Sequence, residues 1–480
     1  MAEDLKQQAA KGIIWKFIEN GGIQAIQFFS GIYIARILLP EDYGLIGMMA
    51  IFLGISQVFI DSGFRYTLIQ RNKNITHDHY NVVFMFNLVV SCFFYLLMFF
   101  GAPLIAKFFH EPRLLLISRV LGLNLIFISL GIIHRTILEK KLKFRTLSKS
   151  NLLAVLISVI AGVIMTKLGF KYWALVAMTL LQNAIFTITI WIINKWTPTL
   201  SFNFTIFKEL YSKSIQIFTA GIISSIGNNI YSVMIGRYFT TNDVGFFSQG
   251  QKLQKRVGNI IVSSMQNVMY PVQSRMQDDL PRLKNAVRKN LKYTTLVTLP
   301  AIIGFIAIAK PFVLITLTEK WLPSIYYLQI LSVAAIFTTI KAALNSYINA
   351  LGLFQLSLKF SLLRNSIPII LIIIGLVLKL DLKILVLGLP ITELLSFTWV
   401  LYFSKKIINY TIREVVIDLF PSVMTSVIMG AVVLYLSDKF QVNIYTLILQ
   451  VIIGGISYIL LNYLFNKELL YEAKSLLFKR

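Results

Sequence analysis

The stretch R-I-L-L-P-E-D-Y-G at residues 36–44 returns as R-Y-F-T-T-N-D-V-G at residues 237–245, a shift of 201 positions (237 − 36). In both places a long segment streaked with polar residues ends at the arginine, and an apolar segment begins after the glycine. Three shared letters are a weak signal by themselves, but here they stand at equivalent junctions. We therefore predict an internal repeat, which is typical of a chain built from related halves. The junction residues are Arg36, Asp42, Gly44, Arg237, Asp243 and Gly245.

Around these junctions the chain is a succession of about fourteen apolar stretches, each with the roughly 18–25 residues needed to cross a ~30 Å hydrocarbon core. Hydrophobic residues make up 56% of the sequence and charged residues only 14%. A soluble protein has about 25% charged residues, so we predict an all-α polytopic membrane protein. Its spans are expected at residues 12–36, 43–60, 80–106, 114–134, 150–166, 172–193, 211–236, 244–270, 291–309, 324–350, 360–378, 384–403, 415–436 and 443–465.

The basic residues predict how the chain is oriented. Lys and Arg number 46 against 21 Asp and Glu, which gives a net charge of +25. They crowd segments such as 135–149 and 252–292, which lie on one side of the membrane when successive spans alternate in direction. Because cytoplasmic loops retain Lys and Arg, we expect both termini in the cytoplasm. The net charge then faces the anionic inner leaflet, and we exclude nucleic acid as a partner.

The repeat also predicts the division of the chain. Six expected spans separate the two junctions, and an even number gives both halves the same orientation. We therefore predict a parallel repeat of two six-helix lobes. Residues 1–205 would form the N-lobe, residues 206–410 the C-lobe, and residues 411–480 two additional spans.

The first span carries an unusual polar face. Lys16, Asn20, Gln24 and Gln27 lie on one side of a helix, with Glu19 beside them. A charge at mid-membrane costs about 2.5–3.5 kcal/mol, so this face is expected to line a wet cavity. The alternative is a Lys16–Glu19 pair one turn apart near the inner surface. We favour the cavity because amides continue the face beyond the pair.

The seventh span repeats this character more weakly. Ser214, Ser225, Asn228, Asn229 and Ser232 share one arc of the helix. Hydroxyl and amide side chains can line a cavity, but they also join helices inside a membrane. Both interpretations stay open for this span.

Three further charged residues are candidates for chemistry. Glu393 lies inside a span, three residues after Pro390, and is interpreted either as an ion-coupling or proton-carrying group or as a carboxylate paired within the bundle. Arg119 also lies inside a span, where it would pair with an acid or meet an anionic ligand. Asp61 ends the second span in D-S-G-F-R; helix capping or a salt bridge is the first expectation, and ion coupling the second.

The junction residues have simpler expected roles. Arg36 and Arg237 stand at helix ends, where long basic side chains reach the membrane surface. Asp42 and Asp243 are expected to cap the helices that follow them, since a carboxylate accepts the free backbone N–H groups there.

Enzyme signatures are weak throughout the sequence. The chain has no ATP-binding loop pattern, and His77 and His79 stand in a loop without further metal ligands. Outside loops of at most roughly 15 residues are too short to fold a catalytic domain. We expect neither an enzyme nor a metal protein.

Three motifs resemble a known family. K-G-I-I-W-K with A-R-I-L-L-P-E-D-Y-G-L-I-G, D-S-G-F-R-Y-T-L-I-Q-R, and M-Y-P-V-Q-S-R-M-Q-D-D-L-P-R-L are similar to the bacterial polysaccharide transporters. That family flips lipid-linked oligosaccharide units and shares a superfamily with multidrug-and-toxin extruders and the lipid II flippase. The resemblance implies two six-helix lobes around a central cavity, two extra C-terminal helices, alternating access and a place in the bacterial inner membrane.

The resemblance also implies a substrate and partners. The substrate would be a polyprenyl-diphosphate-linked oligosaccharide for O-antigen, capsule, exopolysaccharide or teichuronic-type polymers. Membrane lipids, a polysaccharide polymerase and glycosyltransferases would be the partners. In related flippases, charged residues of the first helix are associated with diphosphate binding, and Lys16 would be their counterpart in this chain. The expected substrate contacts are Lys16, Glu19, Asn20, Gln24, Gln27, Arg119, Asn228 and Asn229.

The driving force and two other functions stay open. No cofactor is expected, and coupling to H⁺, Na⁺ or the membrane potential would use Glu19, Asp61 or Glu393. Moving two negative charges outward gains up to ~4.6 kcal/mol per 100 mV. The alternatives are a cation-coupled multidrug or small-molecule antiporter of the same superfamily and a membrane enzyme such as a polymerase.

Overall fold

The computed structural model describes residues 2–70, 75–199 and 201–467, and all regular structure within them is helical. Eleven helices in this part of the chain are long and apolar enough to cross a membrane. The prediction of an all-α, multi-pass membrane protein is confirmed. The other three expected spans coincide with α1 (Ala2–Ile37), α8 (Phe204–Tyr238) and α9 (Thr241–Ser274). These helices carry more polar residues, and the count of fourteen spans stays a prediction.

The chain divides into two compact units, Met1–Gly245 and Phe246–Arg480. Helix α8 packs on α2 and α4 and belongs to the first unit, and α9 begins there. The predicted lobe limits at residues 205 and 410 stay a prediction.

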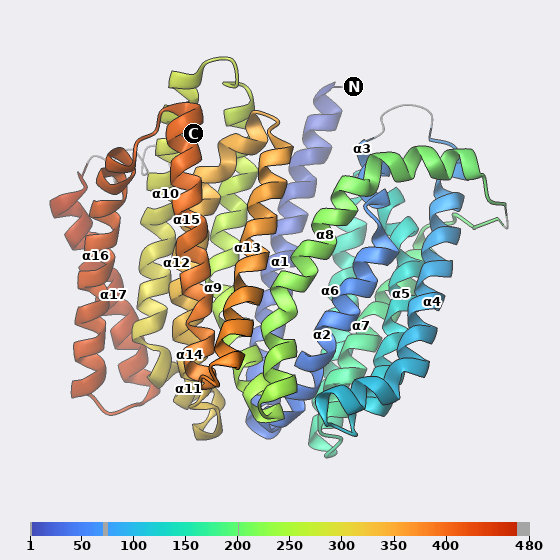
Figure 1. The fold of residues 1–480 in the computed structure, drawn as a ribbon, viewed down its shortest axis with the longest axis horizontal. Helices are drawn as coiled ribbons and strands as arrows, with labels where there is room; N and C mark the ends of the chain where they lie inside the picture. Colours follow the sequence, from blue (N-terminus) through green and yellow to red (C-terminus); the bar gives the residue numbers. More distant parts are fainter. Residues whose placement is uncertain (1, 71–74, 200, 468–480) are drawn as a thin grey trace. The chain divides into compact units, whose positions relative to one another are not determined.

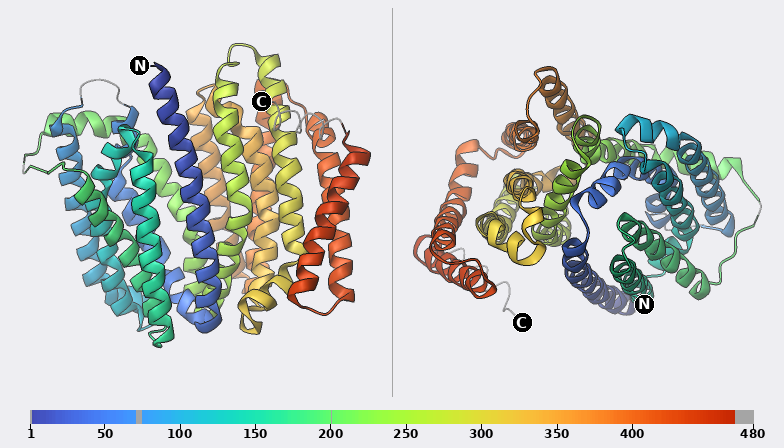
Figure 2. Two further views of the ribbon diagram at one scale, coloured as in Figure 1. Left: turned by 180° about the vertical axis from the view of Figure 1, so that it is seen from behind. Right: turned by 90° about the horizontal axis from the view of Figure 1, so that it is seen from below.

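The first unit is a bundle of long helices (Figure 1). Helix α1 packs along α6, α4 along α5, α6 along α7, and α2 along α8. Figure 2 shows α1 beside α6. The remaining helices of this unit are α2 (Pro40–Asp61), α3 (Phe64–Gln70), α4 (His77–Phe109), α5 (Leu114–Lys140), α6 (Phe144–Lys167) and α7 (Tyr172–Ile193).

The second unit centres on α10 and α12. Helix α10 packs against α12 and α16, α12 against α15, α13 against α15, and α16 against α17. Buried apolar side chains from α10, α12, α15 and α16 form its core, among them Leu291, Leu344, Tyr347, Val400 and Val415. The elements are α10 (Leu280–Ala307), α11 (Ala309–Leu317), the 3-10 turn η1 (Glu319–Trp321), α12 (Ser324–Ala350), α13 (Phe354–Val377), α14 (Leu382–Val386), α15 (Gly388–Ile408), α16 (Ile412–Lys439) and α17 (Ile444–Phe465).

A buried carboxylate joins α16 to α10. The Asp418 side chain is only 1% exposed and accepts two hydrogen bonds from Arg288, at 2.7 and 2.9 Å. The Tyr410 hydroxyl donates to it at 2.7 Å, and Lys292 Nζ lies 3.0 Å away. One acid on α16 thus binds two cations of α10, and it connects the C-terminal helices to the rest of the unit.

The two repeat junctions meet inside the first unit. A Cβ atom on Gly44 would overlap the carbonyl oxygen of Thr241, and one on Gly245 would overlap the carbonyl oxygen of Pro40. Residues 40 and 241 differ by the same 201 positions as the two glycines. Each junction therefore contacts the other through equivalent positions, as two copies do across a two-fold axis.

Asp42 and Asp243 both lie at helix starts. Asp42 accepts hydrogen bonds from the backbone N–H groups of Leu39 at 2.9 Å and Tyr172 at 3.1 Å. Asp243 accepts from the N–H and hydroxyl of Thr240 at 3.1 and 2.7 Å. Each aspartate thus bonds back to the residue that precedes its helix, as the third residue of a capping box does, and Asp42 also binds the start of α7.

The two junction arginines both lie in the last turn of a helix. Arg237 donates to the carbonyl oxygen of Phe108 and lies 5.1 Å from the centre of that ring. Arg36 is an exposed residue in the last turn of α1.

Glu111, in the connection between α4 and α5, provides a pH-dependent contact. Its carboxylate accepts Arg113 Nε and Nη2, both at 2.8 Å, and the Thr241 hydroxyl at 3.2 Å. These hydrogen bonds, those from Arg113 above all, lower the pKa of Glu111 below its usual value of about 4.5. The stabilisation is present in full above the unfolded-state pKa, and it is lost as the pH falls through the lowered folded-state pKa.

Glu111→Gln is therefore expected to lower thermal stability at neutral pH by less than about 1 kcal/mol, since the Arg113 partner is partly exposed. The difference from wild type should vanish under acid conditions, below the lowered pKa. Unfolding midpoints of the purified protein across a pH series measure this. Glu41→Gln is the matched control, because Glu41 contacts Arg113 only once, at 3.4 Å. A Glu111→Gln deficit that persists unchanged in acid would contradict the assignment.

Candidate functional site

The polar face of α1 divides between exposed and buried residues. Asn20 is exposed, Gln24 and Gln27 are half-buried, and Glu19 is only 3% exposed. The Ser148 hydroxyl donates to Glu19 Oε2 at 2.8 Å, and Asn151 Nδ2 donates to Oε1 at 2.7 Å. Glu19 thereby joins α1 to α6. The side chain of Lys16 lies outside the described residues.

Glu19 lines a cavity of about 230 Å³ between α1, α5, α6 and α7. We call it the polar cavity, because all but two of its lining residues are charged or carry amides. Its volume is below the ~300–1,000 Å³ typical of small-molecule sites, so it has room for at most one small polar unit and not for an oligosaccharide. The lining residues are Glu19, Arg135, Glu139, Leu147, Asn151, Gln182, Asn183 and Phe186.

An arginine pair neutralises the second acid of the polar cavity. Arg65 donates Nε and Nη2 to the two oxygens of Glu139 at 2.9 and 2.7 Å, and Arg135 Nε lies 3.0 Å from the same carboxylate. Both arginines exert electrostatic effects on Asp61. Oδ1 of Asp61 is buried and has no hydrogen-bond partner among the described residues.

The D-S-G-F-R motif explains this placement. Ser62 and Gly63 adopt the left-handed region, with φ of 44° and 74°, and they interrupt the helix between α2 and α3. This turn places Arg65 against Glu139 of α5. The salt bridge expected for this motif is therefore made to an acid 74 residues away. Ion coupling through Asp61 stays a prediction.

Arg119, Asn228 and Asn229 are not among the residues that line the polar cavity. Arg119 donates Nε to the carbonyl oxygen of Phe99 at 3.3 Å, and its guanidinium lies 4.6 Å from the centre of that ring. Asn228 is exposed and donates to Ser224 Oγ at 3.2 Å, while Asn229 donates to a backbone carbonyl of α8 at 2.8 Å. Their roles toward a substrate stay predictions.

In the second unit, Glu393 is 7% exposed and bound by two cations. Lys341 of α12 forms an ion pair with its Oε2, and Arg364 Nε of α13 lies 2.8 Å from its Oε1. Glu393 is therefore a carboxylate paired within the bundle, which was one of its two interpretations. Ion coupling through Glu393 stays a prediction. Both cations lie inside the spans expected at 324–350 and 360–378. Each of these cations interrupts an apolar run of the sequence, which was a visible signal that the sequence analysis did not use.

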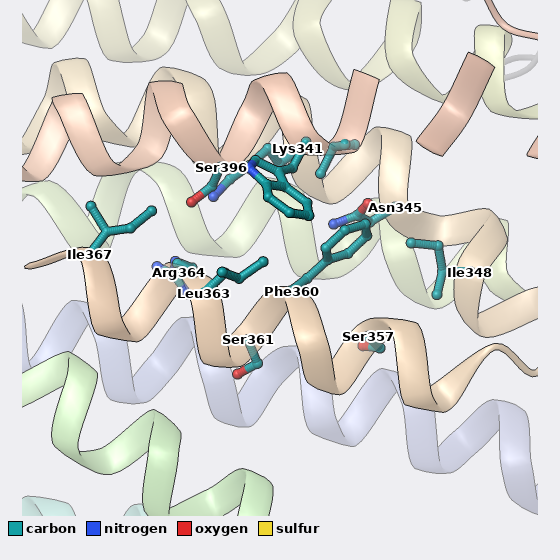
Figure 3. Close-up of a pocket in the computed structure, with 12 residues that line it drawn as sticks. Lys341, Asn345, Ile348, Ser357, Phe360, Ser361, Leu363, Arg364, Ile367 and Ser396 are labelled. Atoms are coloured by element: carbon teal, nitrogen blue, oxygen red, sulfur yellow. The ribbon is translucent and has the colours of Figure 1, made fainter. Parts of the chain in front are cut away.

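Lys341 and Arg364 of this triad border a second cavity of about 190 Å³, here called the triad cavity. Residues Ser357, Phe360, Ser361 and Arg364 follow α13 along it, opposite α12 (Figure 3). Trp399 of α15 also contributes to the lining. Two cations, several hydroxyls and two aromatic rings therefore line a cavity between three membrane-spanning helices, and both cations also bind Glu393.

A multi-pass bundle with charged side chains held between its helices is typical of membrane transporters. The family model described as polysaccharide biosynthesis protein matches residues 33–326, more than half of the chain. The chain belongs to this family.

Relatives extend over most of its length. The chain is 24% identical over 489 residues to an uncharacterized membrane protein in the cps region of Klebsiella pneumoniae, with 98% of each chain covered. It is 22% identical over 366 residues to the teichuronic acid biosynthesis protein TuaB of Bacillus subtilis, with 72% of each chain covered. The resemblance inferred from the sequence motifs is confirmed.

The fold is similar to that of a solved structure, the lipid II flippase MurJ in an inward closed conformation. The TM-score is 0.78 at 18% sequence identity, and the match covers 95% of this chain and 100% of that one. At this identity the likeness establishes the fold.

Proposed function

We propose that this protein is a flippase that moves polyprenyl-diphosphate-linked oligosaccharide units from the cytoplasmic to the outer leaflet by alternating access. The observation that carries the proposal is membership of the polysaccharide biosynthesis family in a chain of membrane-spanning helices. The names of TuaB and of the lipid II flippase agree with this function. The units would serve a cell-surface polysaccharide.

The chemistry of the task fits the residues. A sugar head with its diphosphate cannot enter hydrocarbon, so it needs polar side chains between the helices, whereas the polyprenyl tail stays in lipid. Most of the proposed contacts on α1 and α8 are amides, which both donate and accept hydrogen bonds and so suit sugar hydroxyls. Lys16 and Arg119 are proposed for the diphosphate because cations complement phosphate. This role makes the protein a transporter and not an enzyme.

Location and partners follow from the same proposal. The protein would lie in the bacterial inner membrane with both termini in the cytoplasm, as the distribution of basic residues indicates. A polysaccharide polymerase and glycosyltransferases would act after and before it. The membrane potential, or H⁺ or Na⁺ acting at Glu19, Asp61 or Glu393, would drive the export.

Deletion of the gene tests this function directly. Lipid-linked oligosaccharide is expected to accumulate on the cytoplasmic leaflet, and surface polymer to fall, until the wild-type gene is restored. Accessibility of the sugar to an impermeant reagent distinguishes the two leaflets. Normal polymer and normal lipid-linked sugar in the deletion strain would remove the proposal. Efflux of a cationic dye by the purified protein would instead support an antiporter.

Within this function, Glu19→Gln is expected to lower export about tenfold at normal protein level. The substitution replaces one oxygen of Glu19 that accepts a hydrogen bond from α6. The buried donor on α6 is then left without an acceptor, which costs about 1–3 kcal/mol of free energy. Glu19→Asp keeps the charge and should retain more activity. Polymer production in the deletion strain, normalised to the amount of membrane protein, is the measurement. Wild-type export by both Glu19→Gln and Lys16→Gln would end the assignment of α1 as the substrate helix.

A further inference from the structure

The triad cavity carries an excess of positive charge. Lys341 and Arg364 supply two positive charges and Glu393 one negative charge, which leaves one positive charge uncompensated within the triad. The side chains of Lys341 and Glu393 are 8% and 9% exposed, whereas that of Arg364 is 43% exposed. An uncompensated charge between membrane-spanning helices is costly. An anion that enters beside Arg364 would remove this cost.

The geometry of Arg364 leaves it able to bind such an anion. Only its Nε is used on Glu393, and within the described residues its two terminal amino groups have no hydrogen-bond partner. A guanidinium binds carboxylate or phosphate through two parallel N–H donors. Arg364 can therefore hold an anion while Lys341 keeps Glu393 neutralised.

The rest of the lining suits a sugar ring more than a bare ion. Oδ1 of Asn345 is buried and has no partner among the described residues, so it is available to a ligand hydroxyl. Ser357 and Ser361 lie on the wall formed by α13 (Figure 3). Phe360 and Trp399 add aromatic faces, and Trp399 is 47% exposed. An aromatic ring can pack against the apolar face of a ligand while the polar side chains around it bind the polar groups of that ligand.

We propose that the triad cavity is a binding subsite for one anionic sugar unit of the transported oligosaccharide, with the oxyanion on Arg364 and the ring against Phe360 and Trp399. The inference rests on the proposed function. A cavity of about 190 Å³ holds one such unit and not a whole oligosaccharide. The same oxyanion chemistry is offered by a sugar carboxylate and by the phosphate next to the first sugar, and the experiment separates these two sources.

The test uses the full-length protein, purified in detergent, and follows intrinsic tryptophan fluorescence. Glucuronate, glucose and inorganic phosphate are titrated as separate probes. Glucuronate is expected to change the signal with saturation, and glucose at equal concentration is not. Arg364→Gln should weaken glucuronate binding at least tenfold. Lys359→Gln is the matched control, because Lys359 is an exposed cation of the same helix and does not line the cavity.

Each outcome decides the inference. Saturable binding of phosphate but not glucuronate, with the same dependence on Arg364, keeps the anion subsite and assigns it to the diphosphate end of the substrate. Equal responses to glucose and glucuronate, or unchanged affinity in Arg364→Gln, overturn it. Should Arg364→Gln fail to fold, Asn345→Ala tests the same cavity without breaking an ion pair and is expected to weaken glucuronate binding several-fold. Unchanged affinity in that variant also overturns the inference.

Transport and binding can fail separately. Glucuronate binding through Arg364 in a protein whose deletion leaves lipid-linked oligosaccharide unchanged would refute the proposed function and leave an anion site. Flipping by a protein that shows no Arg364-dependent glucuronate binding would refute the subsite and leave the proposed function in place.

Discussion

Asp418→Asn is expected to lower the free energy of unfolding by about 2–3 kcal/mol. Removing one partner of a buried ion pair costs roughly 3–5 kcal/mol when the remaining charge stays buried. Arg288 and Lys292 are 30% and 36% exposed, so water solvates them in part and the expected cost is lower. The Asp418 carboxylate itself is 1% exposed, which keeps the effect well above that of a surface pair. Thermal unfolding of the purified protein measures the loss.

A surface pair at the start of α10, the helix that carries Arg288 and Lys292, provides the control for this variant. Asp279 lies 3.9 Å from Arg282, with side chains 45% and 72% exposed, and it caps the start of α10. Asparagine caps helices as well as aspartate does, so Asp279→Asn should leave the unfolding midpoint almost unchanged. An Asp418→Asn variant as stable as Asp279→Asn would show that α16 is held by apolar packing and not by this carboxylate.

Gly245→Ala is expected to destabilise the first unit by about 3 kcal/mol, at the upper end of the roughly 1–3 kcal/mol usual for overpacking. The added methyl group would overlap the carbonyl oxygen of Pro40, a backbone atom that cannot rotate away. Gly44→Ala should behave alike, because its methyl group would overlap the carbonyl oxygen of Thr241. The amount of folded protein in the membrane and its unfolding midpoint are the measurements.

Gly101→Ala is the matched control for the junction glycines. Gly101 lies within α4, and a Cβ atom there meets nothing within 4 Å. Alanine favours a helix over glycine by roughly 0.5–1 kcal/mol, so this variant should be neutral or slightly stabilised. If Gly245→Ala were as stable as Gly101→Ala, the close backbone contact of the two junctions would have no energetic role.

The fold was largely predictable from the sequence because the membrane imposes a simple rule. Every backbone group inside hydrocarbon must be paired within its own segment, so a long apolar run predicts a helix without knowledge of its neighbours. Each expected span coincides with a helix, including the polar ones at 12–36 and 211–236. The junction motif was visible as well, since an arginine, an aspartate and a glycine recur at the same spacing in both copies.

The candidate site was less predictable. Glu393 was identified as a charge in a span, but its partners Lys341 and Arg364 are 52 and 29 positions away (393 − 341 and 393 − 364) and were not anticipated. Likewise, Arg65 pairs with Glu139 and not with Asp61, its neighbour in the motif. Ion pairing depends on which helices are adjacent, and helix periodicity carries no information about neighbours.

The sequence by itself determined that this is a multi-pass helical membrane protein with a repeated junction. Local quantities, namely the length of apolar runs, the position of basic residues and the spacing of capping residues, are enough for that. Only the tertiary structure decided that the two junction glycines meet, that Glu19 binds α6, and that Arg364 and Lys341 share one carboxylate beside a cavity. These contacts join residues distant in the chain, and their energies arise from burial and geometry that exist only once the helices pack.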